Sequence, residues 1–400
     1  MIGAGFAGAC AALTLREQLD ADVTVLEQAR APGGMLQALH TRDGLPFEYG
    51  PRVVSVFRGT PDILPFLRRF VALEEREVYQ GTRLRPDYPV IPFPVDMQSL
   101  TRLPCGEQIR QELEEIRAAA LPAPDRSLRH YLEATVGPTL TELAFEGFNM
   151  KFWGRPLERM PADWGRLRRL ERIADIGDFR LPSEAPHHYP PGGFDPLFER
   201  MLAGIDVRTE TRAERIFQDG DRLGVITGGE RLRADLVIAT SRIDTLLEHR
   251  FGPLEWRGYR VEPEVVEDEA PLGRAPDGVP FAWVYTPWLE TPVARTTDFG
   301  VIHHGPDHAG QRVVLRETVD ESVSMYPVWW EAERFDRYLE AASEVPRLVP
   351  LGRLGLYKYV TMDSTLSMVQ RLIGSLEAFI AGDARRRLEI LRHVRGDWQN

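Results

Sequence analysis

The feature that most constrains the fold is a glycine-rich segment at the start of the chain. Gly3, Gly5 and Gly8 fit the pattern G-x-G-x-x-G, and an alanine- and leucine-rich helical stretch follows to about residue 18. A β-branched run then ends in the acid Glu27, about 20 residues after the glycines. Such glycines permit a tight turn, the helix N-terminus supplies N–H donors to a pyrophosphate, and the acid binds a ribose hydroxyl. The start of the chain therefore predicts a Rossmann-like dinucleotide-binding domain.

Further segments extend this prediction along the chain. Only Met1 and Ile2 precede the glycines, which indicates that the true start lies several residues upstream. The pair Gly33-Gly34 after the acidic strand is typical of flavoproteins with a two-dinucleotide fold, and it favours FAD. A buried-strand pattern over residues 233–240 and an amphipathic helix from about 364 to 381 predict that the domain is discontinuous.

The predicted fold class is α/β, with a discontinuous FAD-binding Rossmann-like domain that carries two insertions. A helical substrate or lid domain is expected at residues 98–172, where apolar residues recur with helical spacing. Short alternating runs rich in aromatics and valine predict an antiparallel sheet domain. The expected division is 1–85, 190–250 and 345–400 for the FAD-binding domain, 98–172 for the helical domain, and 86–97 with 251–344 for the sheet domain.

Composition excludes several classes of function. The 400 residues carry a net charge of −11, and an acidic surface argues against nucleic acid as the main partner. No apolar run approaches the ~20 residues of a membrane span, and no signal peptide is visible, so a cytoplasmic location is expected. Cys10 and Cys105 are too few for a disulfide framework, and His303, His304 and His308 read as a solvated loop, so no metal site is predicted.

Five segments resemble motifs of the UDP-galactopyranose mutase family over nearly the whole chain. They include YGPRVVSV, GFNMKFWG, RFGPLEWR and YPV, and the run GRL followed by YKY, at residues 49–56, 147–154, 250–257, 326–328 and 352–359. The chain's two lysines, Lys151 and Lys358, both fall inside these motifs. The resemblance implies an FAD enzyme that interconverts the pyranose and furanose forms of a nucleotide sugar, active when the flavin is reduced. In that family N5 of the reduced flavin attacks the anomeric carbon and displaces the nucleotide diphosphate.

The resemblance also assigns roles to individual residues. Arg295 and Arg168 would be the catalytic arginines that hold the diphosphate, with Arg166 and Arg169 as alternatives to Arg168. The residues expected to bind substrate are Phe148, Asn149, Trp153, Tyr326 and Tyr359. The residues expected to bind FAD are Gly3, Gly5, Phe6, Ala7, Gly8, Glu27, Gln28, Gly34, Met35, Gly352, Arg353 and Met362. NAD(P)H as external reductant and a homodimer are left open.

Four positions depart from the family's pattern. Arg52 and Ser55 stand where the family has histidines, Thr361 replaces an aspartate, and Asp96 replaces an asparagine. These changes leave open a sugar other than galactose or a base other than uracil. Two other readings also remain: an amine-oxidase-like flavoprotein oxidoreductase on the same scaffold, and a homologue that binds a nucleotide sugar without turnover.

Overall fold

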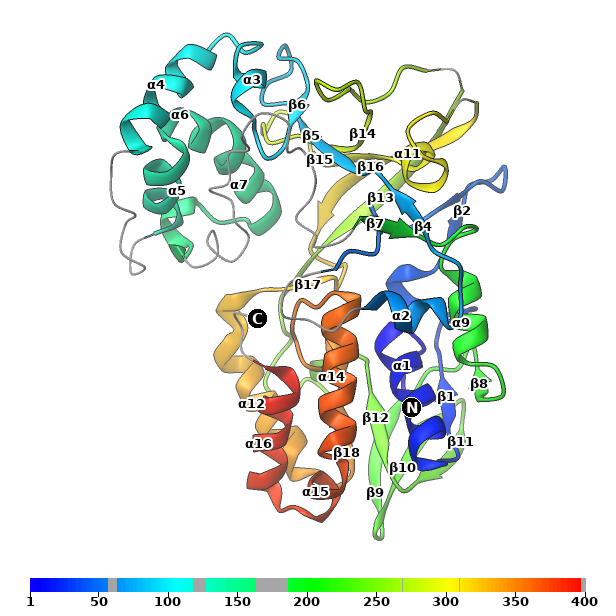
Figure 1. Ribbon diagram of the computed structural model, residues 1–400. Coiled ribbons are helices and arrows are strands. Elements are labelled where there is room, and N and C mark those ends of the chain that lie inside the picture. The colour runs from blue at the N-terminus through cyan, green and yellow to red at the C-terminus, as the bar shows by residue number, and fades with distance from the viewer. Residues whose placement is uncertain (57–62, 118–126, 163–185, 268, 309, 397–400) are drawn as a thin grey trace.

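The chain forms two lobes that are connected by several crossings of the backbone (Figure 1). This computed structural model describes residues 1–56, 63–117, 127–162, 186–267, 269–308 and 310–396. One lobe contains both the first helix and the last helices of the chain, so the two ends of the sequence form a single body. The other lobe contains a large sheet flanked by a group of short helices.

A parallel sheet lies at the centre of the first lobe. Strand β1 (Thr24–Leu26) pairs with β8 (Asp206–Arg208), and β12 (Val237–Ala239) pairs with β18 (Leu348–Pro350), in both cases in parallel. Ile2 forms parallel bridges to residues of both β1 and β12 and so joins the two pairs. The resulting order is that of a Rossmann-like sheet, which confirms the predicted fold class for this part of the chain.

Helices cover the parallel sheet, and α1 packs directly against α14 (Figure 1). The predicted helix at about 364–381 is in fact two helices, because the backbone turns at Ser375 directly after Gly374. The helices of this lobe are α1 (Phe6–Leu19), α2 (Ile63–Arg68), α9 (Asp195–Met201), α10 (Ile243–Leu246), α12 (Ala332–Glu344), α13 (Gly352–Gly355), α14 (Met362–Gly374), α15 (Leu376–Ala381) and α16 (Ala384–Arg395).

A seven-stranded sheet forms the second lobe. Its order is β17-β13-β16-β15-β14-β5-β6. Most neighbours are antiparallel, as predicted, but β5 pairs with β14 in parallel, so the sheet is mixed. β5 also precedes the expected boundary at residue 85; the division into domains stays a prediction. The strands are β5 (Tyr79–Thr82), β6 (Ile91–Pro92), β13 (Trp256–Val266), β14 (Phe281–Tyr285), β15 (Val293–Asp298), β16 (Arg312–Asp320) and β17 (Tyr326–Pro327).

Short helices lie beside one end of this sheet, as the helical spacing of residues 107–116 predicts (Figure 1). They are α3 (Met97–Leu100), α4 (Gly106–Arg117), α5 (Leu128–Val136), α6 (Pro138–Leu140) and α7 (Gly147–Trp153), with a π-helical turn at Thr141–Glu146 and, on the other side of the sheet, α11 (Phe299–His304). Small sheets complete the fold: β2 (Leu39–His40) with β3 (Pro46–Phe47), β4 (Glu74–Arg76) with β7 (His187–Tyr189), and the meander β9 (Arg215–Asp219), β10 (Arg222–Thr227) and β11 (Glu230–Ala234).

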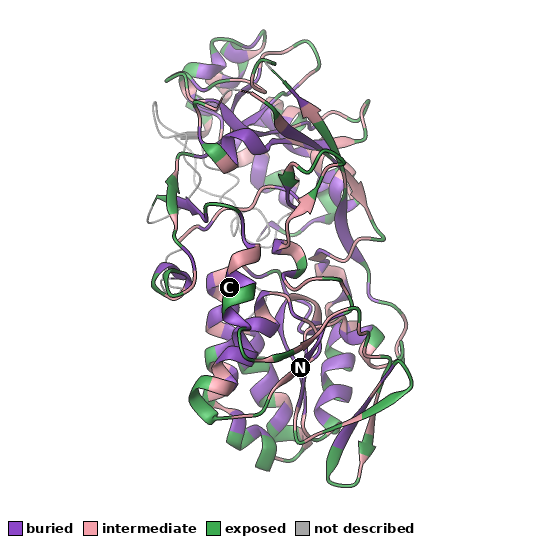
Figure 2. Cartoon of the chain, turned by 90° about the vertical axis from the view of Figure 1, so that its right-hand side faces the viewer, coloured by how far each residue is buried: buried purple, intermediate pink, exposed green. Residues whose placement is uncertain are grey.

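Buried residues run continuously through both lobes (Figure 2). One core cluster joins apolar residues of α1, α5, α7, α12 and α14 with residues of the seven-stranded sheet. Across the described residues, no helix has the length and apolar character needed to cross a membrane.

Candidate functional site

The glycine turn forms the tight link between Ile2 and α1 that the sequence predicts. Gly3 has φ +94°, a conformation that side chains disfavour. A Cβ on Gly8 would lie 2.0 Å from the carbonyl oxygen of Gly3, so only glycine lets the helix approach the turn this closely. Gly5 precedes the first turn of α1, and no side chain caps that end of the helix. The first N–H groups of α1 therefore remain available to a phosphate.

Glu27 connects this turn to the end of β1. Its carboxylate accepts hydrogen bonds from the backbone N–H groups of Ala4 at 2.7 Å and Ala29 at 2.8 Å. These bonds fix the orientation of the carboxylate, which also lines the adjoining cavity. The geometry is suited to an acid that accepts bonds from ribose hydroxyls.

A cavity of about 790 Å³ begins at this turn. Such a volume falls in the range of small-molecule and cofactor sites. Ten of the residues predicted to bind the cofactor line it: Gly3, Gly5, Phe6, Ala7, Glu27, Gln28, Gly34, Met35, Arg353 and Met362. The other two predicted residues, Gly8 and Gly352, are not among the lining residues. A Cβ on Gly352 would lie 2.7 Å from that of Ala7, which does line the cavity.

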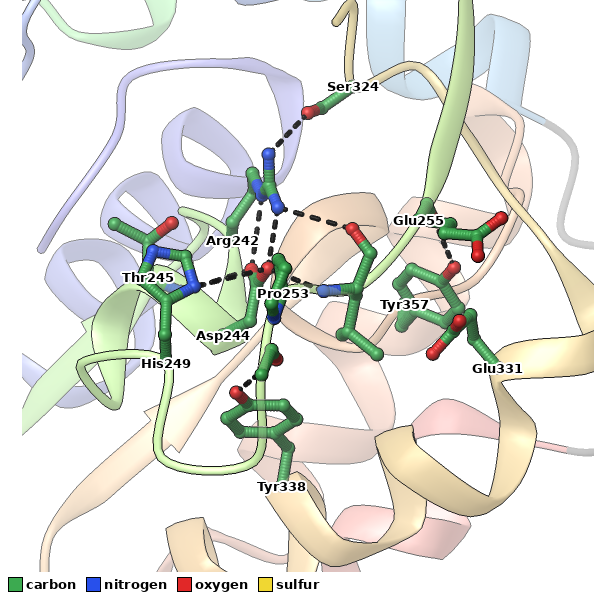
Figure 3. A network of polar contacts seen from close by, with 12 residues as sticks. Arg242, Asp244, Thr245, His249, Pro253, Glu255, Ser324, Glu331, Tyr338 and Tyr357 are labelled. Atoms are coloured by element: carbon green, nitrogen blue, oxygen red, sulfur yellow. Dashed lines mark hydrogen bonds and ion pairs between the residues drawn. The ribbon is translucent and has the colours of Figure 1, made fainter. Parts of the chain in front are cut away.

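A buried carboxylate fixes the chain beside one wall of the cavity (Figure 3). Asp244 accepts hydrogen bonds from Arg242 at 3.0 Å and from the backbone N–H groups of Thr245 at 3.0 Å and Leu254 at 2.9 Å. Arg242 also donates to the hydroxyl of Ser324 at 3.1 Å. Because Arg242, Thr245 and Ser324 all line the cavity, this network fixes its shape.

Arg295, a predicted catalytic residue, lies in a buried ion pair in the seven-stranded sheet. Its Nε and Nη2 atoms each donate to the carboxylate of Glu317 at 2.6 Å, and Thr297 donates to the same carboxylate at 2.9 Å. Burial alone would lower the pKa of Arg295, but the carboxylate of Glu317 raises it well above the ordinary value. The guanidinium also packs over the ring of Tyr259, 5.0 Å from its centroid. Arg295 is thus permanently charged, and Glu317 is a partner that sequence reasoning missed.

A stack of tyrosines lies between Arg295 and the cavity. Tyr326 and Tyr359, both predicted to bind substrate, are stacked with ring centroids 5.4 Å apart. Arg353 packs against both rings, with its guanidinium carbon 4.8 Å from the centroid of Tyr359 and 5.8 Å from that of Tyr326. Tyr326 in turn meets the ring of Tyr259, on which Arg295 packs. The structure therefore brings two predicted substrate residues together with predicted cofactor and catalytic residues.

Helix α7 brings two of the three substrate residues predicted on it into this aromatic group. Phe148 stacks on Phe152, which meets Tyr326 edge to face, with a centroid distance of 5.2 Å. Trp153 also contacts Phe152, with the ring centroids 4.5 Å apart. Asn149, however, is buried, and its amide donates to the carbonyl oxygen of Phe145 one turn earlier in the helix.

Lys151, on the same helix, ties α7 to the ends of two strands. Its ammonium group donates to the carbonyl oxygens of Thr286 at 2.8 Å and Val293 at 2.9 Å. The other lysine, Lys358, donates to the carbonyl oxygen of Arg395 at the end of α16. In the structure, each lysine therefore binds backbone carbonyl groups.

The burial of Lys151 predicts a pH-dependent contribution to stability. Burial lowers the pKa of Lys151 from 10.5 to about 8. Between these values the unfolded chain binds the proton more tightly, so folding of the wild type becomes more favourable as the pH rises. We expect urea unfolding to show a stability difference between wild type and Lys151→Met that shifts in favour of wild type from pH 7.5 to pH 10. A difference independent of pH would mean that this ammonium group is not desolvated.

The departures from the family's pattern have distinct surroundings. Ser55 lines the cavity, and its hydroxyl lies 2.9 Å from Nδ1 of His187, so an imidazole that the sequence did not reveal lies directly behind it. Thr361 lines the cavity at the start of α14. Asp96 instead caps α3 by accepting from the N–H of Ser99 at 2.9 Å, and it is not part of the cavity wall.

The last predictions concern the arginines near residue 168 and the histidines near residue 303. Arg168, like its alternatives Arg166 and Arg169, lies outside the described residues. Within the described part of the chain, no cluster of three or more histidine, cysteine or acidic side chains could hold a metal ion. His303 lies 3.1 Å from the buried carboxylate of Glu48.

Comparisons with known proteins identify the family of the chain. The family model of UDP-galactopyranose mutase matches residues 143–359, and that of an NAD(P)-binding Rossmann-like domain matches residues 1–70. A UDP-galactopyranose mutase of Mycoplasma pneumoniae is 23% identical over 92% of this chain and 93% of that protein. A dTDP-fucopyranose mutase of Escherichia coli is 22% identical over 91% and 94%.

Solved structures show the same fold at lower identity. The crystal structure of a reduced UDP-galactopyranose mutase has a TM-score of 0.73 and is 16% identical, covering 99% of this chain and 98% of that one. Putrescine oxidase has a TM-score of 0.57 at 15% identity, covering 94% and 98%.

Proposed function

The chain belongs to the UDP-galactopyranose mutase family, and from that premise we propose that it is a flavin-dependent mutase. It interconverts the pyranose and furanose forms of a nucleotide sugar. The observation that carries this proposal is the continuity of the site. A dinucleotide-type cavity, with Arg353 in its wall, adjoins the tyrosine stack that leads to the buried Arg295.

FAD is the cofactor that fits the cavity. The glycine turn leaves N–H groups for the pyrophosphate, and Glu27 presents a fixed carboxylate to a ribose. When bound and reduced, FAD supplies N5 as the nucleophile for the anomeric carbon of the sugar. The lining from Met35 to Ser55 and from Arg353 to Met362 is left for the flavin ring.

The chain's own groups hold the substrate's diphosphate. Glu317 occupies Nε and Nη2 of Arg295 and thereby fixes the plane of the guanidinium. Nη1 of Arg295 has no hydrogen-bond partner among the described residues, and we expect this edge of the guanidinium to bind a phosphate oxygen. The hydroxyl groups of Tyr326 and Tyr359 would donate further bonds, and Arg168 would be the second cation. Fixed donors of this kind stabilise a leaving diphosphate without reorganisation.

The substrate is a nucleoside-diphosphate hexose of the UDP-galactose type. The relatives' names cover two nucleotides and two sugars, so neither part is fixed by the family. Ser55 and Thr361 make this side of the cavity chemically different from the family's pattern. We therefore expect the sugar specificity, rather than the handling of the diphosphate, to distinguish this chain.

The test is turnover by the purified, flavin-loaded protein. After reduction with dithionite it is offered UDP-, GDP- and dTDP-hexoses, and pyranose and furanose products are separated by chromatography. We expect conversion of at least one nucleotide sugar by the reduced protein and none by the oxidised protein. Equal conversion in both states would contradict a role for reduced flavin.

One alternative follows from the shared fold with putrescine oxidase. An oxidoreductase would consume oxygen with an amine substrate and would not need Arg295 beside its tyrosines. Oxygen uptake with amines, without any furanose product, would favour this class. Tight binding of a nucleotide sugar without either reaction would identify a homologue that has lost turnover.

A further inference from the structure

Two arginines in the cavity wall, Arg52 and Arg353, meet at Met35. Arg52 lies 3.5 Å from the carbonyl oxygen of Met35 through Nε, and Arg353 lies 3.6 Å from its sulfur through Nη1. Both residues line the cavity, although they are 301 positions apart in the sequence. The loop after β3 and helix α13 therefore place two cations at one point of the wall.

Among the described residues, Arg52 and Arg353 donate only to backbone carbonyl oxygens and, for Arg353, to a sulfur. Arg52 donates to Tyr49 at 2.6 Å and to Pro51 at 3.2 Å. Arg353 donates to Val360 at 2.7 Å and to Met325 at 3.2 Å. Carbonyl groups orient a guanidinium but do not neutralise it. Neither arginine forms an ion pair within the part of the chain that the structure describes.

Three other arginines, each with a side chain that is 9% exposed, form ion pairs with carboxylates. Arg295 pairs with Glu317, Arg312 pairs with Asp298 at 2.9 Å, and Arg257 pairs with Glu321 at 3.2 Å. Arg387 and Arg395 are buried and also donate to backbone carbonyl oxygens, but neither lines the cavity. Arg52 and Arg353 do line it, and a cation in a cavity wall with no ion pair among the described residues favours a ligand of opposite charge.

The guanidinium groups of Arg52 and Arg353 therefore place positive charge beside Met35. Burial lowers the pKa of Arg353, and the neighbouring charge of Arg52 lowers it further, but a guanidinium is so basic that it stays protonated. Three acids line the cavity, and each accepts a hydrogen bond from a group other than these arginines: Glu27 from two backbone N–H groups, Glu214 from the N–H of Gly228 at 3.0 Å, and Asp363 from the hydroxyl of Thr361. In a chain with a net charge of −11, this point of the wall attracts an anion.

We propose that Arg52 and Arg353 together bind the negative charge of the reduced flavin ring. The inference rests on the proposed function, because it requires flavin in this cavity. The glycine turn and Glu27 take the pyrophosphate and the ribose, so the ring is the part of the cofactor that remains for the wall at Met35. Two fixed cations there stabilise the anionic reduced ring more than the neutral oxidised ring. Arg52 is thus a positioning and charge-compensating residue in place of the family's histidine.

The test is the reduction potential of the bound flavin, measured by equilibration with reference dyes. We expect Arg52→Gln to weaken binding of reduced relative to oxidised flavin about tenfold, which lowers the potential of this two-electron couple by about 30 mV. It should also raise the pH at which the reduced flavin becomes protonated. Arg52→Lys keeps the charge and should retain most of the potential. Arg212→Gln removes an exposed cation from the same cavity wall and should leave the potential unchanged.

Each other outcome is decisive. An unchanged potential in Arg52→Gln would overturn the proposal. If Arg52→Gln instead weakens the binding of UDP and leaves the potential unchanged, the pair binds the substrate's diphosphate and the proposal is wrong. Failure of the wild type to bind FAD would refute the proposed function itself, which is a different result. If Arg52→Gln does not fold, Arg353→Gln provides the same measurement.

Discussion

Arg295→Ala is expected to lower the free energy of unfolding by about 3–5 kcal/mol, because it leaves the carboxylate of Glu317 buried and unpaired. Glu317 is 0% exposed, and Arg295 supplies two of the three hydrogen bonds that its carboxylate accepts from the described residues. Urea unfolding of the purified variant measures the loss. The matched control is Arg316→Ala, at the position directly before Glu317 in β16. Arg316 pairs with Glu264 at 2.6 Å, but both side chains are about half exposed, so its loss should cost at most about 1 kcal/mol.

A double variant separates stability from catalysis. In Arg295→Met with Glu317→Leu no charge is left behind, and replacing a whole buried pair by apolar side chains is often neutral for stability. We expect this variant to fold with most of the wild-type stability and to lose mutase turnover by about 10²–10³-fold, the scale of removing one fixed donor. Turnover at the wild-type rate would exclude Arg295 from the site.

Local sequence signals predicted the parts of the structure that depend on neighbouring residues. Gly3, Gly5 and Gly8 specify a turn through the space around their own backbones, and the structure confirms the turn and the parallel sheet beside it. The helical spacing of residues 107–116 likewise appears as α4. Such features can be predicted from the sequence because their physical cause lies within about one turn or one strand of the motif.

The sequence did not predict the contacts between distant segments. Arg295 faces Glu317 because β15 and β16 pair in a particular register, and alternation within a strand does not reveal its partner. The parallel pairing of β5 with β14 has the same origin. Ser55 illustrates the consequence for the site: one motif showed a histidine missing, whereas only the fold shows His187 directly behind the serine.

The environment of a side chain also decides what a motif residue does. Asn149 lies in a segment that resembles a substrate-binding motif, yet its amide satisfies a carbonyl group of its own helix. Lys151 and Lys358 are the two lysines of an arginine-rich chain, and both donate to backbone carbonyl oxygens. Buried donors form hydrogen bonds with whichever acceptors the fold places beside them, and the sequence alone does not show which acceptors these are.

Gly8→Ala is expected to abolish stable binding of FAD. The added Cβ would lie 2.0 Å from the carbonyl oxygen of Gly3, a backbone atom that can retreat only if α1 moves away from the turn. Movement of the helix withdraws the N–H groups that would bind the pyrophosphate. We expect the affinity for FAD to fall at least about 100-fold, or ~2.8 kcal/mol, so that the purified variant lacks flavin absorbance.

The control for this prediction is Gly374→Ala at the end of α14. A Cβ there meets no atom within 4 Å, so this variant should bind FAD like wild type and gain helix stability of up to about 1 kcal/mol. Titration of the flavin-free forms with FAD, followed by fluorescence quenching, compares the two variants directly. Because both substitutions add the same methyl group, a difference between them reports the turn and not alanine itself. Wild-type affinity in Gly8→Ala would show that the pyrophosphate does not lie at the start of α1, and the placement of FAD in the cavity would then be wrong.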